Sequence, residues 1–399
     1  MQTLRTRLSS DIGPAFRRLL LVSGLFGLFV GTAIPYEALY LGRTFELGPA
    51  TTGGLLSVAG LLTLPLQIGS GHLSDAWGRK RLMQAAILSA AAGCLALFLA
   101  PNLAVAAVGL FLISSAIALY LPVAQAMAGD LAAPARRERE FAWLFAAFGP
   151  GFAIGPLLGG IGATLSYASV FGIAGLAALS AAGATLLLRE TVVVVHSDVR
   201  EARGPNAWQD PRVLLLGGLT FSIWLVLCQL VFTGPLWVVR DLGYPNTVYA
   251  LMVSLNGALI FAGQAFLTSR VMHLNSPLVL AGGALTCGVA YGLLIFRSVP
   301  TLFIAAALIT LGQMLIVPTT NALLDRLAPA GRRGQYQGAG AFVQSVGFTV
   351  GPLPGGLLLQ AGSGLLLWST CLVWGAATAA GYVVIAQRLD LRKPQGADR

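Results

Sequence analysis

The chain of 399 residues is 56% hydrophobic and only 10% charged, whereas soluble domains carry about a quarter charged residues. This composition excludes a soluble enzyme. The net charge of +10 would suit a nucleic-acid partner, but the placement of the basic residues explains it differently, as described below. The four cysteines, Cys94, Cys228, Cys287 and Cys371, lie inside apolar runs without metal-ligand spacing, so we predict neither disulfides nor a metal site.

Continuous apolar runs of about 20 residues predict membrane-spanning helices, because a transmembrane barrel would show segments of about ten alternating residues. The first run is too long for a signal peptide, so we expect it to remain as the first helix. We therefore predict an all-α polytopic membrane protein. Hydropathy predicts twelve spans: 18–41, 48–70, 83–101, 103–128, 141–164, 167–188, 212–236, 246–269, 277–297, 300–324, 338–361 and 364–387.

Basic residues fall almost entirely on one side of these spans. The side that carries both termini holds 22 Lys and Arg residues, and the other holds Arg43, Arg240 and Arg297. Short cytoplasmic loops collect Lys and Arg, so both termini are predicted in the cytoplasm, with the chain in a bacterial inner membrane. This bias accounts for the positive charge without nucleic acid.

The longest polar stretch divides the twelve spans into two sets of six. We predict an N-terminal six-helix bundle (1–188), a cytoplasmic linker (189–211), a C-terminal bundle (212–387) and a cytoplasmic tail (388–399). The halves are internal repeats, because the pattern GxxxGPxxGG at 151–160 recurs at 347–356, an offset of 196 residues. Two parallel repeats suit a carrier that rocks around a central site.

The loop between the second and third spans carries the most specific motif. Residues 71–81 read GHLSDAWGRKR, which resembles the loop GxLxDxxGRR/K of the major facilitator superfamily. With twelve spans in two repeats, the resemblance covers nearly the whole chain and implies that family's fold of two pseudo-symmetric bundles. It also implies a conformational latch formed by five residues: Gly71, Asp75, Gly78, Arg79 and Asp130.

In the family, the first glycine of this loop lets helix 2 approach helix 11, and the aspartate faces the positive end of helix 11. The resemblance assigns these roles to Gly71 and Asp75, and it makes Asp130 the partner of Arg79. An anionic side chain near a helix N-terminus is favourable, which agrees with the role of Asp75. The alternative is a topology loop with ordinary turn glycines.

The glycine pattern in the fifth span resembles the motif of the drug:proton antiporter branches of that superfamily. Its glycines recur at intervals of about one turn, which allows close helix packing, and its proline bends the helix. The alternative is generic small-residue packing. The motif residues are Gly151, Gly155, Pro156, Gly159 and Gly160.

Glu37 is the only carboxylate well inside a predicted span. The span 103–128 has no charge, whereas many proton antiporters of the family have an arginine there. An ionisable residue within the membrane is a functional-site hypothesis by default, so Glu37 is our proton-coupling candidate. It lies about 28 Å along the helix from Arg18. The alternative is a carboxylate at the external mouth that pairs with Arg43.

Polar and aromatic residues in the spans predict a substrate cavity, and the absence of deep cations favours a neutral, amphipathic or cationic compound. The candidates are Tyr36, Gln67, Gln125, Gln229, Asn256 and Gln313. Each alone is more often a helix–helix hydrogen bond.

We predict a secondary transporter that exports a small amphipathic, drug-like or sugar-like compound by proton antiport. It would act as a monomer in the lipid bilayer, without metal or cofactor. The alternatives are an importer or uniporter of a small neutral solute and, more remotely, a non-transporting receptor or scaffold. The sequence has no HExxH or Walker motif, so neither an enzyme nor an ATP-driven pump is predicted.

Overall fold

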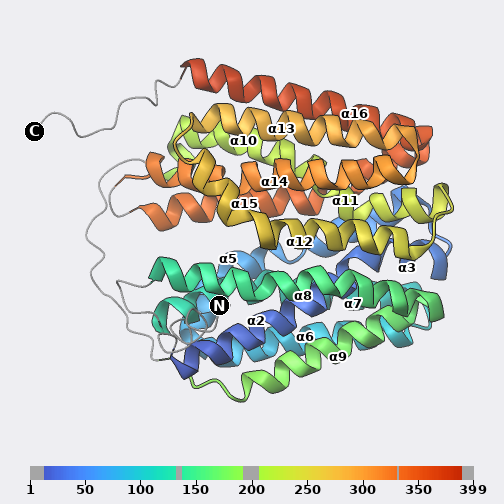
Figure 1. The fold of residues 1–399 in the computed structure, drawn as a ribbon. Coiled ribbons are helices and arrows are strands. Elements are labelled where there is room, and N and C mark those ends of the chain that lie inside the picture. Colours follow the sequence, from blue (N-terminus) through green and yellow to red (C-terminus); the bar gives the residue numbers. More distant parts are fainter. Residues whose placement is uncertain (1–12, 132–136, 192–205, 330–331, 389–399) are drawn as a thin grey trace, which may run out of the picture. The chain divides into compact units, whose positions relative to one another are not determined.

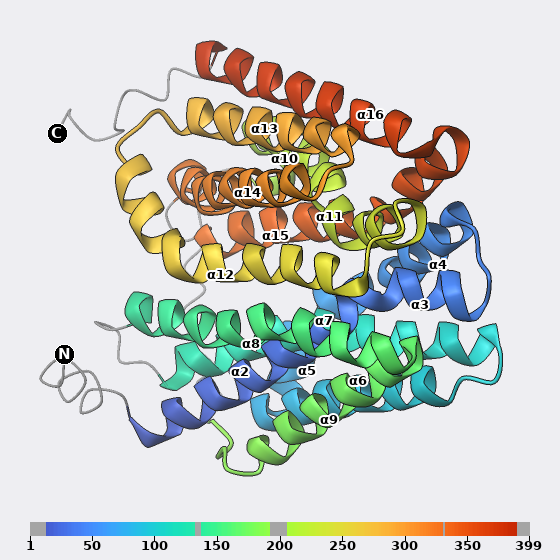
Figure 2. The same ribbon diagram turned by 45° about the vertical axis from the view of Figure 1, so that its right-hand side comes forward.

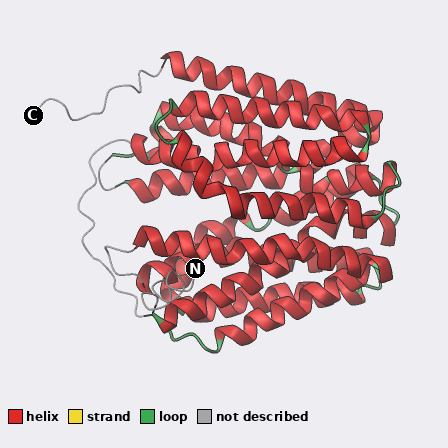
Figure 3. Cartoon of the chain, in the orientation of Figure 1, coloured by secondary structure: helices red, strands yellow, loops and turns green. Residues whose placement is uncertain are grey.

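The computed structural model describes residues 13–131, 137–191, 206–329 and 332–388. Every regular element among these residues is helical, and Figure 3 shows helices joined by short loops. The predicted all-α class is confirmed.

In the first half of the chain the helices run in this order: α2 (Pro14–Ala33), the 3-10 turn η1 (Ile34–Tyr36), α3 (Glu37–Thr44), α4 (Pro49–Leu61), α5 (Leu64–Trp77), α6 (Arg79–Leu99), α7 (Leu103–Leu131), α8 (Arg137–Leu165) and α9 (Tyr167–Thr185).

In the second half they are η3 (Ala207–Gln209), α10 (Pro211–Leu227), α11 (Gln229–Phe232), the π-helical η4 (Leu236–Asp241), α12 (Asn246–Val271), α13 (Ser276–Leu293), η5 (Leu294–Phe296), α14 (Val299–Leu327), α15 (Arg333–Val350) and α16 (Pro352–Arg388).

Eleven stretches of the described chain are long and apolar enough to cross a membrane. The last, Arg333–Gln387, has 55 residues, whereas about 20 suffice for one crossing. Non-helical dihedral angles at Gly362 and Ser363 interrupt it. Because it contains two of the predicted spans, 338–361 and 364–387, the eleven stretches account for all twelve.

Several spans that hydropathy predicts as continuous are broken, including the first and the seventh. In the first, Pro35 falls in the 3-10 turn between α2 and α3, where its missing N–H removes a helical hydrogen bond. In the seventh, α10 ends at Leu227 and is followed by α11 and the π-helical turn. Both breaks lie next to residues that the sequence singles out, Glu37 and Gln229.

The described helices form two compact units. Unit 1 comprises the described residues of Met1–Gly48, Leu55–His196 and Gly234–Phe261; unit 2 comprises those of Pro49–Gly54, Ser197–Thr233 and Ala262–Arg399. In unit 1, α2 packs along α8 and α9, and α6 packs along α7 and α9, as Figures 1 and 2 both show. In unit 2, α13 packs between α14 and α16, and α10 packs along α15 (Figure 2).

Candidate functional site

Glu37 begins α3 and is buried inside unit 1. It is 4% exposed, and its Oε1 atom makes no hydrogen bond with any described residue. One turn further on, Tyr40 donates a hydrogen bond to the Leu97 carbonyl of α6 at 2.6 Å and packs edge-on against Phe171 of α9. Cys94 of α6 is near enough to interact with Glu37 electrostatically. The carboxyl group therefore lies where α3, α6 and α9 meet.

The surroundings of Glu37 make it costly to hold a charge there. Arg43 is exposed near the end of α3, and no ion pair joins it to Glu37 in the described part of the chain. The alternative pairing with Arg43 is thus not present in this structure. An unpaired carboxylate away from water is unfavourable, so the site suits a group that exchanges a proton.

Tyr36, the neighbour of Glu37, contacts different elements. Its hydroxyl donates to the Pro156 carbonyl of α8 at 2.8 Å, and its ring stands edge-on to Tyr249 of α12 with 6.1 Å between centroids. Nearby, the Tyr167 hydroxyl donates to Asn246 Oδ1 at 3.1 Å. The turn at Ile34–Tyr36 therefore connects the buried carboxyl group to the contact between α8 and α12.

The glycines of the motif in the fifth span, which is α8 and is called helix 5 after its order among the spans, pack against the backbone of α2, which is part of helix 1. A Cβ atom on Gly151 would stand 2.1 Å from the Gly24 carbonyl oxygen, and one on Gly155 would stand 2.5 Å from the Gly31 carbonyl carbon. Gly159 faces the ring of Tyr36, 2.4 Å from such a Cβ. No side chain fits at these positions, so the glycines bring two helices together, as small residues do in membranes.

A second face of the motif lies against α12 within unit 1. A Cβ on Gly160 would stand 3.0 Å from the Cβ of Ala250, and one on Gly257 would stand 2.8 Å from the Cα of Ala153. Helix 5 therefore holds α2 on one side and the first part of α12 on the other.

In unit 2 the repeated motif lies in the eleventh span (helix 11), at the end of α15 and the start of α16. It faces the seventh span (helix 7), which contains α10 and α11. A Cβ on Gly351 would stand 2.1 Å from the sulfur of Cys228, and one on Gly355 would stand 2.0 Å from Gln229 Oε1. Gly356 faces the Pro49 carbonyl oxygen of α4 at 2.2 Å. Thus Gly351 and Gly355 pack against helix 7 as Gly155 and Gly159 pack against helix 1.

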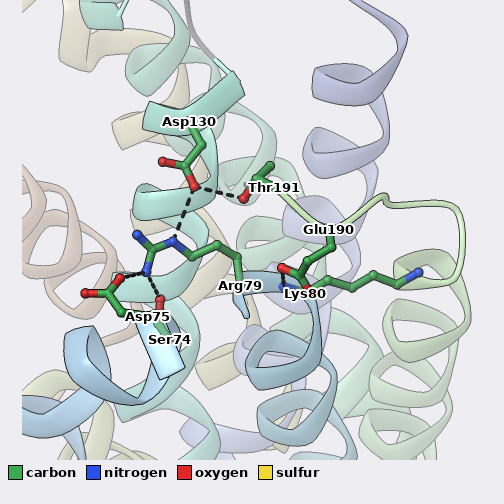
Figure 4. Close-up of polar contacts among 7 residues, drawn as sticks. All are labelled: Ser74, Asp75, Arg79, Lys80, Asp130, Glu190 and Thr191. Carbon is green, nitrogen blue, oxygen red and sulfur yellow. Dashed lines mark hydrogen bonds and ion pairs between the residues drawn. The ribbon is translucent and has the colours of Figure 1, made fainter. Parts of the chain in front are cut away.

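The segment 71–81, predicted as a loop, is helical except at Gly78, which separates α5 from α6. Its latch residues form a polar network centred on Arg79 (Figure 4). The Arg79 guanidinium donates to Asp75 and to the Ser74 hydroxyl, and its Nε donates to Asp130 at 3.3 Å, the contact expected from the sequence. Gly78 adopts a φ of +92°, which L side chains rarely adopt. At Gly71, no atom of unit 1 lies within 4 Å of where a Cβ would stand, so packing inside this unit does not require a glycine there.

The cavity candidates are divided between the two units. Tyr36, Gln67, Gln125 and Asn256 belong to unit 1, and Gln229 and Gln313 belong to unit 2. Tyr36 and Asn256 are buried, whereas Gln67, Gln125 and Gln313 are half-buried on α5, α7 and α14.

Gln229 is engaged at the break of helix 7. Its Nε2 donates to the carbonyls of Leu225 at 2.7 Å and Gly351 at 2.9 Å, and its Oε1 accepts from the Thr233 hydroxyl at 2.8 Å. Backbone groups freed by a helix break must find partners inside a membrane protein. The side chain of Gln229 adds a bond to the Leu225 carbonyl at that break. Its second bond joins helix 7 to the Gly351 carbonyl, which also accepts the Gly355 N–H at 3.1 Å.

Two features were missed by sequence reasoning. The partner of the helix 5 motif is a row of glycines in α2, Gly24, Gly27 and Gly31, and the spacing Gly27-x-x-x-Gly31 was the available signal. Glu190 and Thr191 contact residues of the latch. The Lys80 N–H at the start of α6 donates to Glu190 at 2.9 Å, and the Thr191 hydroxyl donates to Asp130 of α7 at 2.8 Å. No motif points to those contacts.

Comparisons with known proteins match this chain to one family of transporters. A family model described as Major Facilitator Superfamily matches residues 19–352 and 214–396. The chain is 23% identical to a Na(+), Li(+), K(+)/H(+) antiporter of Planococcus maritimus, over 88% of this chain and 90% of that one. It is 28% identical to the class G tetracycline resistance protein of Vibrio anguillarum, over 84% and 87% of the two chains.

Solved structures resemble the fold. The crystal structure of a POT family transporter in complex with 5-aminolevulinic acid superposes with a TM-score of 0.80 at 13% identity, covering 94% of this chain and 96% of that one. At this identity the likeness concerns the fold alone.

Proposed function

The chain belongs to the major facilitator superfamily, whose members are multi-pass transporters of small molecules and not enzymes, and we propose its transport reaction on that basis. It exports a small amphipathic, drug-like or sugar-like compound in exchange for protons. The compound would leave the cytoplasm as protons enter, so the proton gradient supplies the energy and no cofactor is needed. A single copy of the chain suffices, since the fold contains both halves of the carrier.

The observation that carries proton coupling is the burial of Glu37 with an unpaired oxygen. When the carboxyl group is neutral, its burial between α3, α6 and α9 costs little. When it is ionised, the same place is unfavourable unless the surroundings move to admit water or a cation. Loss of the proton therefore favours a different arrangement of the turn at Ile34–Tyr36.

That turn supplies the connection between the proton and the transport cycle. Tyr36 holds Pro156 of α8 and packs on Tyr249 of α12. In our proposal, movement of Glu37 shifts Tyr36 and loosens the contact between α8 and α12. The two six-helix halves (1–188 and 212–387), joined by the linker 189–211, would then change which side of the membrane reaches the central cavity.

The proposed direction of transport and the proposed membrane location are supported by different observations. The motif of helix 5 and the relative whose name is tetracycline resistance protein favour export, and the relative named as a cation/proton antiporter favours exchange with protons. The excess of basic residues on one side and the bacterial relatives support a bacterial inner membrane with both termini in the cytoplasm. Uptake or facilitated diffusion of a small neutral solute on the same fold is the second candidate.

The experiment uses purified full-length protein in proteoliposomes with an imposed pH gradient. Internal pH is followed while ethidium, tetraphenylphosphonium, tetracycline or a disaccharide is added to wild type, Glu37→Gln and the matched control Glu46→Gln. Glu46 is an exposed carboxylate beyond the end of α3. We expect compound-dependent proton flux in wild type and the control and its loss in Glu37→Gln. Transport of a compound by wild type without proton movement would favour the facilitator.

A further inference from the structure

The start of α6 has an unusual charge for a helix N-terminus. Its first three residues are Arg79, Lys80 and Arg81, and its first turn has no acidic residue. The positive end of a helix favours anions, so three cations there are unfavourable. The residue before them, Gly78, has no side chain with which to cap the free N–H groups. Acids from other segments must therefore compensate.

Glu190, just after α9, supplies the missing cap. Its Oε1 accepts the backbone N–H of Lys80 at 2.9 Å, the second residue of α6, which is the position that an N-cap side chain normally serves. A Cβ on Gly78 would stand 2.6 Å from Glu190 Oε2, so the carboxylate fits directly over this glycine. Figure 4 shows the side chain of Lys80 extending away, so the contact uses its backbone.

Lys80 makes the reciprocal contact at the other helix. Its Nζ donates to the Leu188 carbonyl at 2.7 Å, just beyond the end of α9, which has no basic residue in its last turn. Cations are favourable at a helix C-terminus. Arg18 of α2 adds a bond to the Leu187 carbonyl at 2.9 Å. The beginning of α6 and the end of α9 thus compensate each other's charge.

Thr191 extends the contact to the latch. Its hydroxyl donates to Asp130 Oδ2 at 2.8 Å, the same oxygen that accepts Arg79 Nε at 3.3 Å. Arg79 in turn binds Asp75. One chain of hydrogen bonds therefore runs from the linker through Asp130 and Arg79 to the aspartate of the latch (Figure 4).

We infer that residues 189–191, where the linker begins, form part of the latch, with Glu190 and Thr191 as positioning residues. Glu190 holds the start of α6 in place, and Thr191 holds Asp130 in the orientation that receives Arg79. Since this linker joins the two halves of the chain, a movement of one half that pulls on it would release the latch. The role of the latch in transport rests on the proposed function, but the docking of the linker does not.

The test is hydrogen exchange on the full chain in lipid nanodiscs, read at the peptide that contains the Lys80 amide. Glu190→Ala removes the acceptor, and Glu190→Gln keeps an acceptor oxygen. Thr191→Val removes the hydroxyl at constant shape, and Thr191→Ser keeps it. We expect exchange at Lys80 to accelerate about five- to tenfold in Glu190→Ala, as for the loss of one hydrogen bond, and less than about twofold in Glu190→Gln.

The decisive variant is Thr191→Val, because the Thr191 hydroxyl donates to Asp130 of α7 and it is Glu190 that accepts the Lys80 N–H. If the linker and the latch form one unit, it accelerates exchange at Lys80 by at least about threefold, and Thr191→Ser does not. Unchanged exchange in Glu190→Ala, or a Thr191→Val effect confined to the linker peptide, would overturn the inference. None of these hydrogen-exchange measurements needs a transported compound. If the transport proposal alone fails, the proteoliposomes show no flux while hydrogen exchange at Lys80 responds to the variants as expected.

Discussion

Helix 5 and helix 11 carry the same glycine motif at an offset of 196 residues, yet their glycines meet different neighbours. In unit 1, Gly151 and Gly155 face the backbone of α2. In unit 2, Gly351 and Gly355 face the side chains of Cys228 and Gln229. At equivalent positions the neighbours therefore differ in one case, since Gly155 faces the backbone of Gly31 and Gly351 faces the sulfur of Cys228. Gly159 and Gly355 each face a side chain, that of Tyr36 and that of Gln229.

The difference follows from the partner helix. α2 has glycines of its own at the contact, so nothing separates the two backbones. Helix 7 instead breaks after Leu227, and Gln229 occupies the space beside Gly355 while its Nε2 donates to the carbonyls of Leu225 and Gly351. The glycine motif allows the close approach of a neighbouring helix. The sequence of that helix determines whether its backbone or a side chain lies against the glycines.

The largest expected effect is that of Gly151→Ala. A Cβ there would stand 2.1 Å from a carbonyl oxygen and 2.6 Å from the backbone nitrogen of Leu28, and neither can rotate away. Overpacking of this kind costs about 3 kcal/mol or more, so we expect a large loss of thermal stability in mild detergent. The control is Gly183→Ala on α9, where nothing lies within 4 Å and alanine favours the helix. Equal stability of the two variants would contradict the backbone contact.

Gly355→Ala is expected to cost less, because the atoms in its way are the end of the Gln229 side chain. We predict about 1–2 kcal/mol of destabilisation. Gln229→Ala alone should cost about 1–3 kcal/mol, since it removes buried hydrogen bonds to the Leu225 and Gly351 carbonyls and to the Thr233 hydroxyl.

A double-mutant cycle sharpens this comparison. The pair should be less destabilising than the sum of the two single variants, by more than about 0.5 kcal/mol, because Gln229→Ala provides the room that alanine at position 355 needs. Strict additivity in thermal unfolding would show that the two residues do not compete for one space.

The smallest expected effect concerns the caps of the two pseudo-equivalent first helices. Gly13 precedes α2 without a side-chain cap, whereas Asp210 caps α10, accepting Arg212 N–H at 2.9 Å, Arg212 Nη2 at 2.8 Å and the Tyr336 hydroxyl at 3.0 Å. Its hydrogen bonds with Arg212, above all, hold the pKa of Asp210 below its usual value. We expect Asp210→Asn to lower the free energy of unfolding by about 1 kcal/mol at pH 7.

The pH dependence of this effect has a definite sign. A carboxyl group whose pKa is lowered by folding stabilises the protein at pH values above its pKa in the unfolded state, about 3.9. This stabilisation is lost as the pH falls through the pKa of the folded state. The gap between wild type and Asp210→Asn should therefore be constant above about pH 5, narrow below about pH 4 and vanish once the pH is below the folded pKa. Asp325→Asn, in an exposed pair at 3.5 Å with Arg333, should change stability by no more than about 0.5 kcal/mol. A gap that widens in acid would exclude this role of Asp210.

Hydropathy and spacing predicted much of this molecule because they depend on neighbouring residues. The twelve spans were available from hydropathy. The contact between Arg79 and Asp130, which are 51 residues apart, was available only through the family resemblance. The cap provided by Glu190 was not, because a residue 110 positions from Lys80 leaves no local pattern. Nor was the engagement of Gln229, since its partners arise only when helix 7 breaks. Sequence placed Glu37 within a helix, but only the fold shows that it is buried, one turn before Tyr40, which contacts α6 and α9.

The most direct test of proton coupling through Glu37 compares two modes of transport in the Glu37→Gln variant. It uses whichever compound the wild-type protein transports in the proteoliposome experiment. Exchange of labelled for unlabelled compound across the membrane at equal pH requires no net proton movement, whereas accumulation driven by a pH gradient does. We predict that Glu37→Gln retains exchange and loses accumulation. Loss of both to the same extent would make Glu37 a purely structural residue, and retention of accumulation would place proton coupling elsewhere.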